Sequence, residues 1–290
     1  MEALGCSRVH NAMAAAGVMH RAYVEAMCWV NHRETFGQKL VEREGIQAEL
    51  LRLKVAWSGG AALAFESARS FDETLSDSSS APWLRVVTAI AKYATAETAL
   101  NSTATAMELV GGLGYTKDHP IERIHRDAMV LRVWEGPKHI QARELMSMLK
   151  RGGAEAFLER LDQILDALPA EIMDEDQAQL SGIRDTIEGS LAALSQMPEK
   201  ADLTAYRFLE SLSSALTYAL LCEQAAEELF VHQDQTKLLI ARSYYEENYS
   251  NPAHISLSYS GLHKNFYSVS QGVPVLLSDE MKLKLGRPTI

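Results

Sequence analysis

Apolar residues recur every three or four positions along most of the 290-residue sequence, the spacing expected for one buried face of an α-helix. In the first half these series run through Val18, Ala22, Ala26 and Val30, then through Ile46, Leu50, Leu53, Trp57 and Ala61. In the second half they run through Phe157, Leu161, Ile164 and Leu168, then Leu180, Ile183, Ile187, Leu191 and Leu194, then Leu209, Leu212, Leu216 and Leu220. No segment shows a convincing strand alternation. The pattern therefore predicts an all-α fold.

Helix-breaking residues divide the first half into segments. The expected helices cover residues 11–33, 46–70, 83–110 and 138–149. Residues 71–82 are dense in Ser and Asp and are expected to form a surface loop, and residues 115–137 a connecting segment. Four helices of this kind bury their apolar stripes as an up-and-down four-helix bundle.

A glycine pair suggests where the first unit ends. Gly152 and Gly153 follow the fourth expected helix, so we predict one domain over residues 1–150 and a second helical region over residues 151–290. Residues 248–275 contain Ser, Asn, Gly and two prolines, and are expected to be a loop or tail.

The charge is unevenly distributed. Residues 1–150 hold 17 acidic and 17 basic side chains, whereas residues 151–290 hold 21 acidic and 11 basic ones. An acidic surface repels phosphate backbones, so nucleic-acid binding by the second half is not expected.

The composition excludes several other classes of protein. No stretch approaches the roughly 20 apolar residues of a transmembrane helix, and no secretory signal is recognisable, so a cytoplasmic location is expected. Cys6, Cys28 and Cys222 are widely separated and are expected to be buried small hydrophobic residues. No paired metal-ligand spacing occurs, and no metal is expected.

Three local patterns could carry chemistry, and each has a plain alternative. Arg33, Thr35 and Phe36 follow a long expected helix, where they could bind a pyrophosphate and cover a flat ring, or form a polar helix end with a packed Phe. Gly111 and Gly112 could let a ligand approach the backbone, or could simply stop a helix.

The third pattern is Glu135, between Trp134 and Gly136 and before a proline-started helix. A carboxylate covered by apolar surface can serve as a general base. An isolated Glu before a helix can equally be a solvent-exposed residue that favours the positive helix end.

The order and spacing of these segments resemble the carboxy-terminal helical domain of the acyl-CoA dehydrogenases. The segments that carry the resemblance are 33–40, 108–115, 120–127, 134–136 and 140–141. The resemblance covers about residues 4–150, and the remainder looks like the extra helical region of the long-chain and alkylation-response branches of that family.

This resemblance implies FAD-dependent α,β-dehydrogenation of an acyl-CoA thioester. Glu135 matches the catalytic base that removes the α proton while the β hydride passes to the flavin, and its backbone N–H matches a group that polarises the thioester carbonyl. Gly5 and Ser7, where some relatives keep a second acidic residue, offer no alternative base. Arg8, Trp134 and Gly136 are then expected to contact the substrate.

The same resemblance implies cofactor contacts across a subunit interface, and hence a homo-oligomer, either dimer or tetramer. The residues in the matching positions are Arg33, Thr35, Phe36, Glu108, Gly111, Gly112 and His139. Three positions depart from the family pattern: Glu108 stands where Gln is usual, Pro137 where Thr is usual, and His139 where Gln is usual.

The resemblance also implies that the amino-terminal helical and central β domains of the family are missing from this sequence. Another polypeptide could supply them, the sequence could be a fragment of a longer product, or the chain could be a non-catalytic helical scaffold. A DNA-repair relative of the alkylation-response type is a third hypothesis, against which the acidic second half argues.

Overall fold

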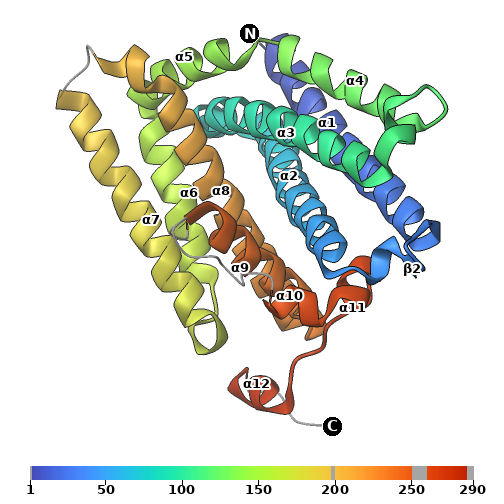
Figure 1. The fold of residues 1–290 in the computed structure, drawn as a ribbon. Coiled ribbons are helices and arrows are strands. Elements are labelled where there is room, and N and C mark those ends of the chain that lie inside the picture. The colour runs from blue at the N-terminus through green and yellow to red at the C-terminus, as the bar shows by residue number, and fades with distance from the viewer. Residues whose placement is uncertain (1, 197–199, 250–259, 286–290) are drawn as a thin grey trace.

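The computed structural model describes residues 2–196, 200–249 and 260–285, most of which are helical (Figure 1). The helices of the first half are α1 (Glu2–His32), α2 (Glu44–Ser76), α3 (Ala81–Val110), α4 (Pro120–Val133) and α5 (Lys138–Met148). Those of the second half are α6 (Ala154–Ala167), α7 (Ala170–Gln196), α8 (Ala201–His232), α9 (Thr236–Tyr249), α10 (Ser260–Lys264), α11 (Phe266–Gln271) and α12 (Asp279–Lys284). The all-α prediction is confirmed.

Short elements join these helices. They are the antiparallel hairpin of β1 (Glu34–Thr35) and β2 (Gln38–Lys39), and the single turns η1 (Leu40–Glu42), η2 (Ser78–Ser80), η3 (Gly111–Tyr115) and η4 (Leu149–Gly153). At η4 the chain changes direction, and Gly152 has a φ of 85° there, in the left-handed region that glycine tolerates.

In the first half α1, α2 and α3 pack against one another, and α4 and α5 pack against α3 (Figure 1). Small residues allow the close approach of these helices. A Cβ added at Gly60 on α2 would lie 2.1 Å from the tip of the Met19 side chain of α1, which would have to move to admit it. The core between the three long helices is built largely from alanine, including Ala15, Ala22 and Ala89.

Helix α8 organises the second half, because it packs against α6, α7 and α9 and also against α2 and α5 (Figure 1). An ion-pair network joins three of these helices: Arg160 of α6 lies 2.9 Å from Glu66 of α2 and 2.6 Å from Glu223 of α8. The second half therefore covers one side of the first, and the division at residue 150 stays a prediction.

Two expectations for the first half are wrong. Residues 71–76 continue α2, and within it the Thr74 and Ser76 hydroxyls donate to helix carbonyls. The helix ends at Asp77, whose side chain accepts the N–H of Ser79. The connecting segment contains α4, which begins at Pro120, a residue suited to a first helical turn.

Two expectations elsewhere also need correction. The expected tail contains α10 and α11, whose Leu262, Phe266 and Val269 are buried, while residues 250–259 lie outside the described part. Of the cysteines only Cys222 is buried, since Cys6 and Cys28 lie on exposed faces of α1.

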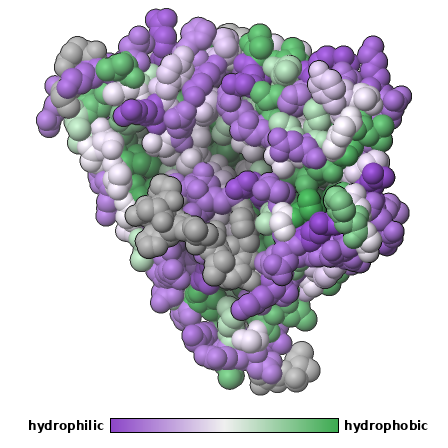
Figure 2. Space-filling view, in the orientation of Figure 1, coloured by the Kyte–Doolittle hydropathy of each residue, from purple (hydrophilic) through white to green (hydrophobic). Residues whose placement is uncertain are grey.

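The surface carries no large continuous apolar area on the face shown in Figure 2, where hydrophilic residues separate smaller apolar patches. No described helix is long and apolar enough to cross a bilayer. Within the same residues no group of His, Cys, Asp and Glu side chains is arranged to hold a metal ion. The cytoplasmic location stays a prediction.

Candidate active site

Glu135 occupies a tight turn between α4 and α5. Its φ is 60° and that of Gly136 is 100°, so two successive residues have positive φ. For a residue with a Cβ this conformation costs roughly 1 kcal/mol, and it persists only where surrounding contacts impose it. The Glu135 side chain is half-buried, and the Ser7 hydroxyl of α1 donates to Oε2 at 2.8 Å.

Buried donors from three helices hold the backbone of this turn. Arg8 Nε of α1 donates to the carbonyl of Glu135 at 3.2 Å, and Gln141 Nε2 of α5 donates to the same oxygen at 2.9 Å. Lys92 Nζ of α3 donates to the carbonyl of Gly136 at 2.7 Å. The turn conformation is therefore held from the interior of the protein by side chains that are themselves almost fully buried.

The sequence did not single out Ser7 or Lys92 as site residues. A signal existed for Lys92, because it is the one charged residue between positions 86 and 96 of a helix that is otherwise apolar or small in composition. A charge in such a run has to find partners inside the fold. No comparable signal exists for Ser7, whose partner lies 128 positions away in the chain.

The backbone N–H of Glu135 has no hydrogen-bond partner in the part of the chain that the structure describes. It donates to no backbone oxygen within the described residues, whereas the N–H of the preceding Trp134 bonds to Val130 at 3.1 Å. The turn thus presents a carboxylate and a free backbone donor from the same residue.

A pocket of about 320 Å³ lies beside this turn and shares Arg8 with it. Its lining includes Arg8, Arg85, Thr88, Glu144, Ser147 and Arg151. The first turn of α3, with Ala81 and Pro82, also faces it and adds the positive end of a 30-residue helix. Only Glu144 opposes this charge, and it is already paired with Arg8 at 2.5 Å, so the pocket favours anions.

The β1–β2 hairpin carries Arg33, Thr35 and Phe36. Phe36 is 98% exposed at the hairpin tip with a φ of 54°, so the packed-Phe alternative is wrong. Its ring is approached by the Arg43 guanidinium at 5.7 Å, and Arg43 also donates to the Thr35 carbonyl at 2.7 Å. The hairpin therefore exposes an aromatic ring at its tip.

The remaining predicted residues lie at the surface. Gly111 ends α3 with a φ of 78°, which confirms its role as a helix stop, and open space surrounds both Gly111 and Gly112. Glu108 is exposed on the last turn of α3, and His139 is exposed on the first turn of α5. Trp134 is 52% exposed beside Glu135.

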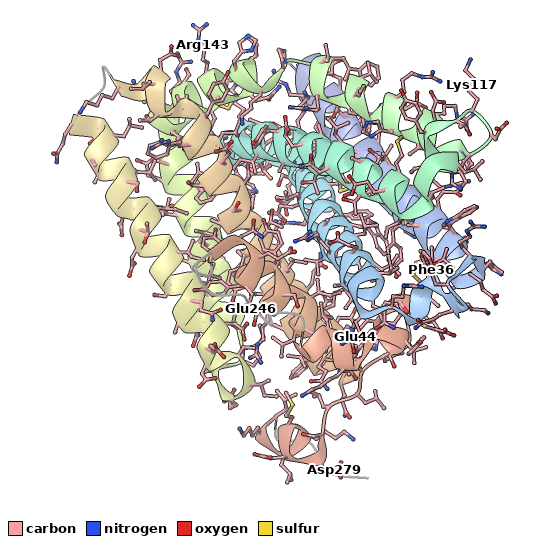
Figure 3. All side chains as sticks on the ribbon, in the orientation of Figure 1. Phe36, Glu44, Lys117, Arg143, Glu246 and Asp279 are labelled. Atoms are coloured by element: carbon pink, nitrogen blue, oxygen red, sulfur yellow. The ribbon has the colours of Figure 1, made fainter. Side chains whose placement is uncertain are left out.

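These residues form two groups at opposite ends of α1. Arg8, Trp134, Glu135 and Gly136 lie together at the end where α1 begins, whereas Arg33 follows its last residue. At about 1.5 Å per residue, 25 helical residues separate Arg8 from Arg33 by about 37 Å. In Figure 3 Phe36 accordingly lies far from Arg143 of α5, the helix that follows the Glu135 turn.

The glycine motif belongs with the hairpin group. His119, four residues after η3 ends, packs edge-on against Trp29 in the last turns of α1, with ring centroids 5.8 Å apart. The structure therefore brings the predicted base and substrate residues together at one end of α1, and places the hairpin and the glycine motif towards its other end.

A family model described as the C-terminal domain of acyl-CoA dehydrogenase matches residues 1–150, half of the chain. The chain belongs to the acyl-CoA dehydrogenase family. The resemblance in the sequence is thereby confirmed.

Among acyl-CoA dehydrogenase relatives, the AidB protein of Escherichia coli strain K12 is 30% identical over 161 residues, which are 53% of this chain and 30% of AidB. The crystal structure of Caenorhabditis elegans ACDH-11 in complex with C11-CoA has a TM-score of 0.77 at 23% identity, covering 92% of this chain and 46% of that one. An acyl-CoA dehydrogenase from Bacillus anthracis complexed with FAD has a TM-score of 0.74 at 14% identity, covering 98% and 51%.

The likeness to these two acyl-CoA dehydrogenase structures extends well past residue 150 and shows the fold of both halves. The second half therefore shares the helical fold of the corresponding region of these two proteins. The chain spans between 30% and 51% of the length of the relatives named above.

Proposed function

We propose that this chain carries the catalytic base, together with parts of the substrate and cofactor sites, of an FAD-dependent acyl-CoA dehydrogenase. The observation that supports this function is the Glu135 turn. A carboxylate in a strained conformation, fixed by buried donors from α1, α3 and α5, is arranged for a purpose other than stability.

In this reaction Glu135 accepts the α proton of the acyl thioester. Its backbone N–H donates to the thioester carbonyl and stabilises the negative charge that develops on that oxygen as the proton leaves. Ser7 holds the carboxylate at Oε2, which leaves Oε1 to receive the proton. The carboxylate and the donor come from one residue, so their relative positions are fixed by the turn.

The pocket lined by Arg8, Arg85 and Arg151, here called the arginine pocket, suits the phosphate groups of coenzyme A. Arg85 and Arg151 are exposed at its mouth and have no acidic partner among the described residues. Arginine binds phosphate oxygens through paired N–H donors, and the start of α3 adds favourable dipoles. The pocket meets the Glu135 turn at Arg8, so a bound acyl-CoA would enter past the arginines and reach the base with its thioester.

The hairpin and the glycine motif suit FAD. Phe36 offers a free aromatic face, Arg33 offers an unpaired guanidinium within the described residues, and the backbone at Gly111 and Gly112 is open to close approach. When bound, FAD supplies the acceptor for the β hydride. This chain's residues would hold the cofactor by ring stacking and by hydrogen bonds to its phosphates.

The proposed enzyme is a homo-oligomer. The hairpin lies about 37 Å along α1 from the base, well beyond the length of one flavin dinucleotide, so a single chain cannot place both groups on the same cofactor. A second copy, arranged with α1 in the opposite direction, brings its hairpin to the first copy's base. Dimers and tetramers both satisfy this requirement.

The test is the substitution Glu135→Gln in the flavin-loaded enzyme. Gln is similar in size and can still accept the Ser7 hydrogen bond, but it cannot take up a proton at neutral pH. We expect acyl-CoA dehydrogenation to fall by about 100-fold or more, with the flavin absorbance retained. The rate is measured by reduction of a dye acceptor with butyryl-CoA and palmitoyl-CoA as substrates.

Glu122→Gln is the matched control, because Glu122 is a carboxylate on α4 whose salt bridge to Arg126 lies away from the turn. It should leave the rate unchanged. Turnover by Glu135→Gln at the wild-type rate would show that another group removes the proton.

A further inference from the structure

Lys92 is a buried cation beneath the Glu135 turn. Its residue is only 1% exposed, and it ranks among the largest fully buried side chains of the chain. An ammonium group removed from water is costly unless hydrogen bonds and opposite charges compensate it. Its contacts therefore need an explanation.

The ammonium group bonds to carbonyls on both sides of Glu135. Lys92 Nζ lies 2.7 Å from the oxygen of Gly136 and 3.3 Å from the oxygen of Arg132. Arg132 is in the last turn of α4, where carbonyls lack partners within the helix and the helix dipole is negative. Lys92 thus caps α4 from α3 and closes the turn in the same contact.

Charged groups face Lys92 from several elements. Arg8 of α1 and Arg132 of α4 repel the ammonium group, while Glu97 of α3 and Glu135 of the turn attract it; α5 contributes the uncharged Gln141. Burial, reinforced by Arg8, lowers the pKa of Lys92 to about 8. The charge is thus held in place at a cost, which its bonds to the turn partly offset.

We propose that Lys92 is a positioning residue for the base: by bridging the carbonyls of Arg132 and Gly136, it sets the left-handed conformation that aims the Glu135 carboxylate. The catalytic importance of this orientation of Glu135 rests on the proposed function. The bridging itself can be measured on the 290-residue chain without flavin or substrate.

The experiment is amide hydrogen exchange of the peptide 130–141, which contains the bonded N–H groups of Trp134, Ile140 and Gln141 on either side of the turn. In the wild-type chain, opening of the turn returns Lys92 to water and to an ordinary pKa. The open form then binds more protons than the closed form between about pH 8 and pH 10, so opening becomes harder as the pH rises.

We expect protection of this peptide, corrected for the intrinsic rate, to increase about tenfold from pH 7 to pH 9. Lys92→Met fills the same space without donors. It should remove this pH dependence and speed exchange of the same peptide at pH 7 by about tenfold, because the Arg132 carbonyl loses its partner.

Lys54→Met is the matched control, since Lys54 is a partly buried lysine that lies over the Trp57 ring, away from the turn. It should keep the wild-type profile for residues 130–141. The proposal is overturned if wild-type protection shows no pH dependence, or if Lys92→Met accelerates exchange equally along the whole chain. The wild-type pH profile decides the matter even if Lys92→Met does not fold.

The flavin-loaded enzyme separates this inference from the proposed function. There Lys92→Met should lower kcat and leave KM for acyl-CoA unchanged, because the arginine pocket is intact. If Glu135→Gln retains turnover, the proposed function fails while the exchange result stands. If Glu135→Gln is inactive and the exchange profile lacks its pH dependence, only the role of Lys92 fails.

Discussion

At the scale of single residues, the backbone conformation at position 135 favours glycine, whereas the proposed chemistry requires a carboxylate there. A φ of 60° suits glycine, and glycine occupies the next position, yet the first position carries a carboxylate. Arg8, Lys92 and Gln141 supply the contacts that keep this conformation populated. Such strain at a polar residue with buried support is typical of functional sites.

The strain can be measured by comparing Glu135→Gly with Glu135→Ala. Both variants lose the Ser7 hydrogen bond, so their difference isolates the conformational cost. We expect the Gly variant to be more stable to urea by about 1 kcal/mol. At Asp127, an exposed position within α4, the order should reverse, with Ala more stable than Gly by about 1 kcal/mol. The same order at both positions would show that the turn is relaxed.

At the scale of elements, the contact of the two halves depends on charge as well as on apolar packing. Glu66 of α2 is 5% exposed and is bound by Arg160 of α6 and by Arg69 of its own helix. Burial opposes ionisation of this carboxyl group, but hydrogen bonds from Arg160 and Arg69 outweigh it and hold the pKa of Glu66 below its usual value.

Arg160→Met should therefore lower the free energy of unfolding by about 3 kcal/mol at pH 7, because it removes a cation shared by Glu66 and Glu223. Since the pKa of Glu66 is lowered in the fold, its stabilising effect is present above about pH 4 and is lost as the pH falls through the folded value. The difference between wild type and variant should shrink accordingly in acid.

Urea titrations at pH 7 and below pH 4 measure both effects. Arg184→Met is the control, because the side chains of its partners Asp162 and Glu188 are 47% and 55% exposed, and it should cost less than about 1 kcal/mol. Equal losses for the two arginine variants would contradict the role of burial.

Most helices could be predicted from the sequence because their apolar residues repeat at helical spacing over many turns. Helix α4 was not predicted although Ile121, Ile124, Ala128 and Leu131 carry the same spacing, because charged residues between them obscure the apolar pattern. Helix α11 could not be predicted, since its six residues are stabilised by burial of Phe266 and Val269 against other elements.

The candidate site was predictable only in part. Glu135 stands in a recognisable local pattern, and family resemblance gave it a role that the comparisons support at the level of the family. The contacts of Ser7 and the arginine pocket depend on tertiary packing between helices that are distant in the chain, and no local pattern encodes them. For Lys92 the sequence indicates a buried charge but not its partners. The role of each site residue stays a prediction.

At the scale of the whole molecule, the proposed function requires each site to combine residues of two copies, because the two groups of site residues lie at opposite ends of α1. This arrangement can be tested by mixing inactive variants. One variant carries Glu135→Gln, and the other carries Arg33→Ala with Phe36→Ala. In a mixed dimer one site combines the intact base of one copy with the intact hairpin of the other.

Random mixing in equal amounts should restore about a quarter of the wild-type rate, since half of the dimers are mixed and each has one complete site. The variants, each together with the domains that complete the flavin-loaded enzyme, are mixed in mild denaturant, refolded with FAD and assayed with acyl-CoA. Glu135→Gln mixed with Glu135→Ala serves as the control and should recover nothing. Absence of recovery in the first mixture would show that the base of one copy and the hairpin of another do not form one active site.

Helix α1 therefore sets the distance and the relative orientation of the two groups of site residues. Because this helix runs unbroken from Glu2 to His32, inserting one residue would shift the hairpin by about 1.5 Å along the helix axis and rotate it by about 100° relative to the Glu135 turn. In the proposed assembly, a change in the length of α1 would misalign the hairpin of one copy with the base of the other. The number of residues in α1 would then itself be a requirement of the proposed assembly.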